Sequence, residues 1–426
     1  MARALWIGAA VAASSVAFAA HADEGMWTFD AFPANKMKVA YGWAPDKAWL
    51  DHVQAASVRL TSGCSASLVS KNGLVLTNWH CSVGCAQTNS TTKDDYVKNG
   101  FVAAKREDEK SCPGVQAEIL SSIADVTGEV KDAIVKAPSD AISKARNGAI
   151  AKIESDACKD TPKNRCQVVE LFHGGQFKLY TYRKYTHVRL ALIPEEAIGF
   201  FGGDPDNFNF PRYNLDVSLV RLYEDGKPAA TPSHLGWRMD APKKGEPLLV
   251  SGNPGGSSRL DTMTQLAFDR DWAFPLTQTL RAEILGRLYA YSGLSEENRR
   301  EAADTVFGNE NSYKAIGGRW LALLDPAFIA QKTNEEAELR AAIAAKPDLA
   351  KDIGDPWADT ANAMRAYENI YYAFGMLEAR AGSISQMYRW ARTLVRGAQE
   401  RSKPNGDRLP AFTDSSLPLT QKLLMQ

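Results

Sequence analysis

The sequence predicts a mainly β domain followed by a helical domain. From Val58 to about Gly252, short apolar and β-branched runs alternate with Gly, Asn, Asp and Pro, a pattern typical of the strands and turns of a barrel or sandwich. From about Leu266 onward, Ala, Leu, Glu and Arg dominate, and apolar residues recur three and four positions apart, as in helices. A chain of 426 residues is also too long for one ordinary domain. We therefore expect a β-barrel unit over residues 23–265 and a helical unit over residues 266–426.

The first 22 residues have the pattern of a cleavable export signal. Arg3 precedes an apolar run from Ala4 to Ala20, and the small residues Ala20 and Ala22 form a cleavage site. An uncleaved membrane anchor is the alternative, but the run is rich in Ala and shorter than the roughly 20 strongly apolar residues that a membrane span needs. We expect cleavage after Ala22 and export to the periplasm, with no membrane contact by the mature chain.

Charge excludes some classes of partner. Lys plus Arg and Asp plus Glu number 50 each, so the chain has no basic excess that would attract nucleic acid or anionic lipid. We expect no nucleic-acid partner.

Cysteines that reach an oxidising compartment are expected to form disulfides. The six are Cys64, Cys81, Cys85, Cys112, Cys158 and Cys166. Six cysteines allow 15 pairings, which a sequence does not resolve rigorously. We expect Cys64–Cys81, Cys85–Cys112 and Cys158–Cys166, of which the first and last close short loops. The alternative is a zinc site of His80, Cys81, Cys85 and Cys112, but the spacing matches no common zinc finger. We expect no metal and no cofactor.

Strand candidates fill most of the first domain. They are residues 65–69, 74–77, 166–172, 177–182, 187–192, 217–223 and 247–251. The first two flank Asn72-Gly73, a strong hairpin signal because both residues tolerate positive φ. Residues 123–152 are rich in Ala, Lys and Glu at helical spacing, which predicts a helical insertion on the outside of the barrel.

Two features organise the predicted helical domain. Thr333 followed by Glu336 resembles a capping box, which predicts that a helix starts at Thr333. An aromatic stripe formed by Tyr371, Tyr372, Phe374 and Met376 lies in another helix, which we expect to continue through Leu377 and Met387 to Leu394. Such a stripe is typical of core packing between helices.

The segment from Gly63 to Cys81 indicates a catalytic base. Two strands and a tight turn place His80 at the end of a hairpin that Cys64 and Cys81 can tie closed, so the imidazole can be aimed. The segment resembles the Thr-Ala-Ala-His-Cys element of chymotrypsin-like serine peptidases, in which the partner Cys lies a similar distance upstream. The alternative is that His80 only packs beside a structural disulfide, but the extent of the matching segment favours catalysis.

A general base of this kind needs a carboxylate on its other ring nitrogen. Asp216 is the candidate because it stands at the entry of the alternating strand 217–223 and follows His80 in the chain. In chymotrypsin-like enzymes the orienting Asp occupies a similar position. An isolated Asp at the start of a strand is more often a turn residue, and the order and flanking sequence favour the catalytic role here.

The flanking sequence resembles one family. Residues 200–212, Phe-Phe-Gly-Gly-Asp-Pro-Asp-Asn-Phe-Asn-Phe-Pro-Arg, look like the Phe-Gly-Gly-Asp-x-Asn-Trp-x-Trp-Pro-Arg stretch of the dipeptidyl-peptidase 7 and 11 family. Residues 23–27, 63–81 and 252–255 agree in the same order. The resemblance implies a chymotrypsin-like double β-barrel, incomplete here, followed by an incomplete helical domain. It also implies a serine-type dipeptidyl-peptidase that removes dipeptides from peptides with a free N-terminus.

By the same resemblance, Asn207 and Phe208 hold the α-amino group of the substrate. An amide oxygen accepts from an ammonium group, and an aromatic face attracts a cation. The alternative is that Asn207 caps a turn and Phe208 belongs to the core. Phe208 and Phe210 stand where the family has Trp, Trp79 where it has a second His, and Gly256 where an Arg is common. These differences bear on the substrate preference. The sequence leaves open whether the protein forms a homodimer.

No nucleophile of the expected kind occurs in the sequence. In this fold the catalytic Ser stands in Gly-x-Ser-Gly, whose backbone N–H groups form an oxyanion hole, and no such tetrapeptide occurs from Asp23 to Gln426. Ser257 and Ser258 are the nearest imitation, but they align with a loop that is not the nucleophile in the family. We therefore expect an N-terminal fragment that is inactive alone. The rival functions are an inactive peptide-binding pseudo-peptidase and a chymotrypsin-like endopeptidase.

Overall fold

The computed structural model describes residues 25–139, 141–200, 207–209, 213–253, 260–378 and 385–425. The expected export signal and the Gly255–Arg259 loop with Ser257 and Ser258 therefore lie outside the described residues. The chain divides into two compact units, Met1–Asp46 and Lys47–Gln426. From residue 25 on, the first unit contains the 3₁₀ turn η1 (Phe29–Ala31) and helix α1 (Ala34–Tyr41). Of the helices in the described ranges, none combines the length and apolar character that crossing a bilayer requires.

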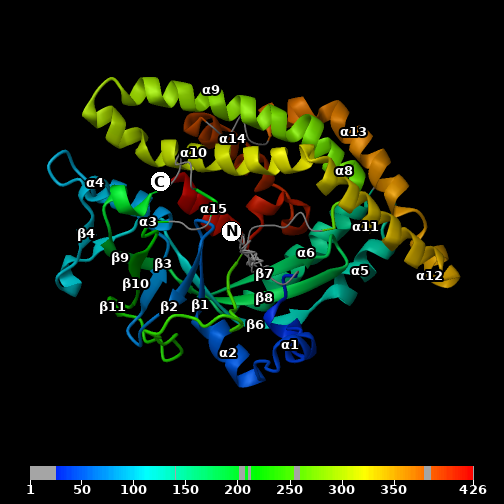
Figure 1. The fold of residues 1–426 in the computed structure, drawn as a ribbon, viewed down its shortest axis with the longest axis horizontal. Coiled ribbons are helices and arrows are strands. Elements are labelled where there is room, and N and C mark those ends of the chain that lie inside the picture. Colours follow the sequence, from blue (N-terminus) through cyan, green and yellow to red (C-terminus); the bar gives the residue numbers. More distant parts are fainter. Residues whose placement is uncertain are drawn as a thin grey trace, which may run out of the picture. The chain divides into compact units, whose positions relative to one another are not determined.

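The second unit is built on one antiparallel sheet, which is drawn in Figure 1. Its eleven described strands are β1 (Ser57–Leu60), β2 (Ser65–Leu68), β3 (Leu74–Thr77), β4 (Phe101–Val102), β5 (Lys110–Ser111), β6 (Ala117–Asp125), β7 (Asn164–Leu171), β8 (Gln176–Tyr185), β9 (His187–Ile193), β10 (Ser218–Glu224) and β11 (Lys227–Pro228). They pair in the order β4-β9-β10-β3-β2-β1-β6-β8-β7, with β5 on β9 and β11 on β10. Among the described strands this path is open, so the mixed α/β fold is confirmed and a double barrel is not.

Six of the seven predicted strands form, and the run at residues 247–251 does not. That segment is Pro-Leu-Leu-Val-Ser and has strand-like composition, but Leu248 and Val250 are 67% and 97% exposed. A β-branched run becomes a strand only where a neighbour offers backbone hydrogen bonds, and no described strand pairs with this one. Conversely, the predicted strands do not include β1, β4, β5, β6 or β11, and β6 takes up the first residues of the expected helical insertion.

The predicted hairpin between β2 and β3 forms, with positive φ at Gly73 and not at Asn72. Gly73 has φ +72°, and a Cβ placed there would lie 2.7 Å from the carbonyl oxygen of Leu222. Glycine is therefore required by both the backbone conformation and the close approach of β10. Ser67 then pairs with Leu76 and Leu68 with Val75, which directs Leu68 and Val75 into the core.

The predicted insertion is helical from Thr127. Helices α5 (Thr127–Val135) and α6 (Ile142–Cys158) pack on β7 and β8, as Figure 1 shows. Val130 on α5 joins Val126, Val168 and Phe177 in a small apolar core of its own. The insertion therefore has its own core beneath the helices, separate from the main core of the sheet.

The described chain after residue 262 is mostly helical, as predicted. Its helices are α8 (Met263–Phe268), the π-helical turn η3 (Asp269–Ala273), α9 (Phe274–Ser292), α10 (Glu296–Leu324), α11 (Pro326–Ala344), α12 (Pro347–Ile353), α13 (Pro356–Leu377), α14 (Gln386–Glu400) and α15 (Leu417–Leu424). Figure 1 shows α9 and α10 as a long packed pair. The position of the domain boundary at residues 265 and 266 stays a prediction.

Two predicted details of these helices are wrong. Thr333 lies inside α11 and donates to the carbonyl oxygen of Ile329, whereas Asp325 caps that helix. Pro326 at the first helical position and the Asp325 cap are the stronger start signal. The aromatic stripe does not continue into one long helix, because α13 ends at Leu377 and α14 begins at Gln386. Tyr371 packs on Phe268 as expected, whereas Tyr372 is 62% exposed.

Candidate active site

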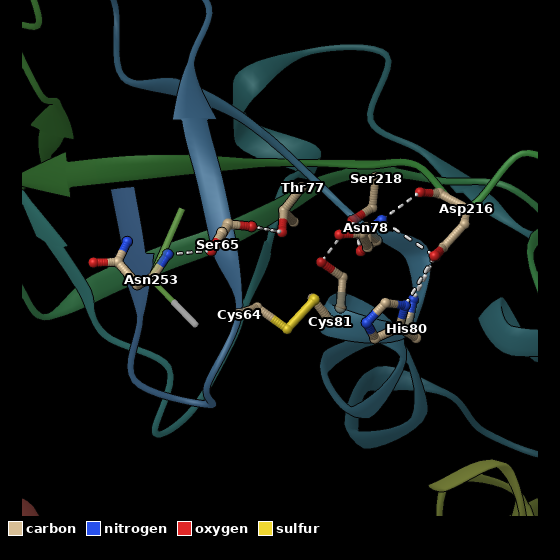
Figure 2. Close-up of a disulfide and its surroundings, with 10 residues drawn as sticks. Cys64, Ser65, Thr77, Asn78, His80, Cys81, Asp216, Ser218 and Asn253 are labelled. Carbon is tan, nitrogen blue, oxygen red and sulfur yellow. Dashed lines mark hydrogen bonds and ion pairs between the residues drawn. A yellow bond between two sulfur atoms is a disulfide. The ribbon is translucent and has the colours of Figure 1, made fainter. Parts of the chain in front are cut away.

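The backbone at His80 is fixed by the residues that precede and follow it. Strand β3 ends at Thr77, and helix α3 (Trp79–Asn89) begins two residues later, so His80 lies in the first helical turn. The next residue, Cys81, forms a disulfide with Cys64, the residue just before β2. The preceding residue, Trp79, is fully buried. The His80 side chain itself is 58% exposed, so a fixed backbone presents an accessible imidazole (Figure 2).

Asp216 faces His80 from the neighbouring strand. Strand β10 pairs with β3 so that Ser218 lies opposite Thr77, which brings Asp216, two residues before β10, beside the start of α3. His80 Nδ1 lies 3.0 Å from Oδ2 and 3.1 Å from Oδ1 of Asp216, and the backbone N–H of His80 donates to Oδ1 at 3.2 Å. The Asp216 side chain is only 13% exposed. A buried carboxylate on Nδ1 is the arrangement that leaves Nε2 as the basic atom.

Nε2 of His80 has no hydrogen-bond partner within the described parts of the chain. The nearby hydroxyls are engaged elsewhere: Ser65 Oγ accepts from the backbone N–H of Asn253, and Ser218 Oγ donates to the carbonyl oxygen of Asn78. In Figure 2 the side chains of Ser65 and Ser218 lie above the disulfide, and no dashed line joins either of them to the imidazole of His80. The geometry therefore places the Asp216 carboxylate on Nδ1 of His80, and no serine among the described residues is hydrogen-bonded to Nε2.

The predicted amino-binding residues lie next to the long helices. Asn207 is 2% exposed, and its Nδ2 donates to Oδ1 of Asn311 on α10 at 3.1 Å. Phe208 is 55% exposed, so it is not a core residue, and its φ is +64°. A left-handed aromatic residue is strained, and such strain is concentrated at functional sites. Asn311 could not be found from the sequence, because 104 residues separate it from Asn207.

An aromatic cluster joins the start of α3, next to His80, to the helix that carries Asn311. The ring of Trp79 lies 5.9 Å from Phe200 and 5.7 Å from Phe307, and those two rings are 4.0 Å apart. Trp79 Nε1 also donates to the carbonyl oxygen of Pro194 at 2.9 Å. Phe307 lies four residues before Asn311, on the same face of α10. The Trp at this position therefore fills the space between the sheet and α10.

The cysteines form the three expected disulfides, Cys64–Cys81, Cys85–Cys112 and Cys158–Cys166. Within the described residues, Cys64, His80 and Cys81 are close enough together to resemble a metal site. The two sulfur atoms are bonded to each other, so neither is a thiolate that could bind zinc. The zinc alternative with Cys85 and Cys112 fails for the same reason.

The Peptidase S46 family model matches residues 22–426. The chain belongs to the peptidase S46 family. This confirms the family expected from the sequence, since relatives that the chain matches carry the names of dipeptidyl-peptidases. An Asp/Glu-specific dipeptidyl-peptidase of Shewanella putrefaciens is 27% identical over 418 residues, 93% of this chain and 56% of the relative. Dipeptidyl-peptidase 7 of Phocaeicola vulgatus is 26% identical and covers 76% of this chain and 48% of its own length.

The fold of this chain is also shared with a solved structure. Porphyromonas endodontalis DPP11, crystallised with the dipeptide Arg-Glu, has a TM-score of 0.75 over 95% of this chain and 60% of that one, at 21% identity. Likeness at this identity concerns the fold. The chain spans about half the length of the curated S46 relatives it matches.

Proposed function

We propose that this chain carries the His–Asp part of a serine-type dipeptidyl-peptidase that is exported to the periplasm. The hydrogen-bonded pair of His80 and Asp216 supports the serine-peptidase chemistry most directly. The names of the S46 relatives support the release of N-terminal dipeptides. The three disulfides support export, because disulfides persist in oxidising compartments.

In the proposed reaction, Nε2 of His80 takes the proton of a serine hydroxyl as its oxygen attacks the peptide carbonyl. The same nitrogen then gives that proton to the leaving amine, and a water molecule hydrolyses the acyl-enzyme in a second round. Asp216 keeps the Nδ1–H tautomer in place and stabilises the imidazolium that forms in each round.

The amino end of the substrate is proposed to lie at Asn207, Phe208 and Asn311. The amide oxygens of the two asparagines are acceptors for an ammonium group, and the exposed ring of Phe208 offers it an aromatic face. Binding of a free amine at a fixed distance from His80 would explain cleavage after the second residue. Peptides with a free N-terminus are therefore the proposed substrates.

We place the nucleophilic serine outside this chain. The sequence has no Gly-x-Ser-Gly after residue 22, and the described residues leave Nε2 of His80 without a partner. The unmatched length of the relatives offers room for it. Segment 247–251 pairs with no described strand. We propose that it pairs with strands of the serine-bearing part and so forms a strand of a second β-barrel, which would complete the chymotrypsin-like fold.

Dipeptide binding tests the proposed amino site without requiring catalysis. We expect Ala-Glu or Ala-Leu with a free amine to shift backbone NMR signals near Asn207, and the N-acetylated dipeptides to shift none. Asn207→Ala should weaken the affinity by at least about tenfold, because a hydrogen bond to a charged group is lost. Asn362→Ala, at an exposed asparagine of α13, is the matched control. Equal binding of free and acetylated dipeptides would rule out the exopeptidase assignment.

A fluorophosphonate probe tests where the nucleophile lies. We expect the purified chain to show no labelling and no hydrolysis of dipeptidyl fluorogenic substrates above the level of His80→Ala. Labelling that disappears in His80→Ala would place the serine inside this chain and contradict the proposed location. When the serine-bearing part is supplied, His80→Ala should lower kcat/KM by at least about 10³-fold, because the general base is lost. Cleavage of an N-terminally blocked peptide would favour the endopeptidase instead.

A further inference from the structure

We propose that Asn78 is a positioning residue that orients Asp216 toward His80. The inference rests on the proposed function, in which Asp216 orients the general base, and it adds the group that orients the acid. Figure 2 shows Asn78 directly beside the carboxylate of Asp216.

The side chain of Asn78 does not do what its position would predict. Asn78 is the N-cap residue of α3, with φ −78° and ψ 155°, but it makes no side-chain capping hydrogen bond. Asparagine is among the best capping residues, and its oxygen usually accepts from a backbone N–H in the first turn. Here Nδ2 instead donates at 3.1 Å to both Oδ2 and the carbonyl oxygen of Asp216. The Asn78 side chain therefore lacks the stabilising hydrogen bond of an N-cap and bonds to Asp216 instead.

Together, Asn78 and His80 fix both oxygens of the carboxylate. Oδ2 of Asp216 accepts from Asn78, and Oδ1 accepts from the backbone N–H of His80. Nδ1 of the imidazole faces the edge between the two oxygens. The two donors and the imidazole all belong to the start of α3, so the plane of the carboxylate is set relative to the ring it must orient.

Asn78 also accepts a hydrogen bond from β10, the strand that follows Asp216. Ser218 Oγ donates to the carbonyl oxygen of Asn78 at 2.7 Å and lies 2.8 Å from Oγ of Ser82. Ser218 and Ser82 are 0% and 2% exposed. Asn78 thus forms hydrogen bonds with Asp216 and Ser218, the residues on either side of Val217. These bonds hold the segment that contains Asp216 against the start of α3.

The competing explanation is that Asn78 serves only local stability. Two substitutions separate the roles. Asn78→Ser retains an N-cap residue but cannot reach Asp216, whereas Asn78→Ala lacks both functions. A stabilising role predicts that Ser substitutes well and Ala poorly. A positioning role predicts that both substitutions change the tautomer of His80 to a similar extent, whichever of the two variants is the more stable.

The tautomer of His80 is the readout, because it reports the Asp216 contact and not the stability of the chain. Multiple-bond ¹H–¹⁵N NMR of histidine-labelled protein at alkaline pH should show His80 with the proton on Nδ1, the signal being assigned with His80→Gln. We expect Asn78→Ser and Asn78→Ala each to lower the Nδ1–H fraction by about twofold, with Asn78→Ser the more stable of the two on heating.

Two controls make the result decisive. Asp95 caps α4 (Tyr96–Asn99) with its own side chain, so Asp95→Ser should alter stability and leave the His80 tautomer unchanged. Asp216→Asn should abolish the Nδ1–H preference. A wild-type tautomer in Asn78→Ser together with a lost preference in Asp216→Asn would overturn the role of Asn78 and leave the proposed function standing. An unchanged tautomer in Asp216→Asn would instead remove the orienting pair, and the proposed function with it.

Discussion

Replacing Trp79 with alanine should lower the free energy of unfolding by about 3–5 kcal/mol, the usual cost of removing a large buried aromatic side chain. Trp79 is 0% exposed, and its ring contacts Phe200 and Phe307. The cavity cannot close easily, because the sheet lies on one side and α10 on the other. The substitution also leaves the carbonyl oxygen of Pro194 without its donor.

Urea unfolding monitored by circular dichroism measures the loss. Trp237→Ala is the matched control, because Trp237 is 69% exposed and its removal should cost less than about 0.5 kcal/mol. Trp79→Phe should have an intermediate cost, since it keeps an aromatic ring but loses the Nε1 donor. If the losses for Trp79→Ala and Trp237→Ala agree within error, the aromatic cluster does not join the sheet to α10.

Gly199 gives an independent check of the same packing. A Cβ at Gly199 would lie 2.3 Å from Cδ1 of Trp79, a separation that real contacts do not reach. Gly199→Ala should therefore displace the Trp79 ring and destabilise the chain without removing any aromatic atom. Gly236→Ala is its control, since a Cβ there meets nothing within 4 Å.

The parts of the site that could be predicted are those encoded by adjacent residues. The sequence predicts His80 from a run that includes its hairpin, its turn and its disulfide, and Asp216 from its place before a strand, and the structure brings these two side chains together. Both signals are local because each residue is fixed by the strand next to it. Asn311 and the contact of Asn78 with Asp216 were missed, because they depend on elements far apart in the sequence.

The wrong predictions have the same physical origin. Residues 247–251 have the composition of a strand, but composition supplies no partner, and pairing decides whether a strand forms. Thr333 and Glu336 have the spacing of a capping box, yet Glu336 accepts from the backbone N–H of Met263, a tertiary contact. Spacing gives the residues that could interact, and packing selects those that do.

Replacing Glu118 with alanine should cost about 3–5 kcal/mol, although no catalytic role is proposed for it. Glu118 lies on β6 with its side chain 0% exposed. It accepts from Nη1 of Arg59 at 2.6 Å, and from Nε and Nη2 of Arg165 at 2.6 and 2.9 Å. These bonds connect β1, β6 and β7. Removing the carboxylate leaves two arginines, 31% and 17% exposed, without the charge that offsets their desolvation.

The comparison with weaker changes identifies the cause. Glu118→Gln keeps the volume and an acceptor oxygen, so it should cost less than Glu118→Ala. Asp51→Ala breaks the exposed pair of Lys47 and Asp51 and should cost at most about 0.5 kcal/mol, because water screens both charges. In the background of Arg59→Met and Arg165→Met, Glu118→Leu should recover much of the stability, since a buried ion network can be replaced by packed apolar side chains. Urea denaturation of these variants shows whether the Glu118 carboxylate stabilises the chain by offsetting the desolvation of the two arginines. If Glu118→Ala is no worse than Asp51→Ala, the arginines are adequately solvated without Glu118. The three-strand network would then contribute to the specificity of pairing and not to stability.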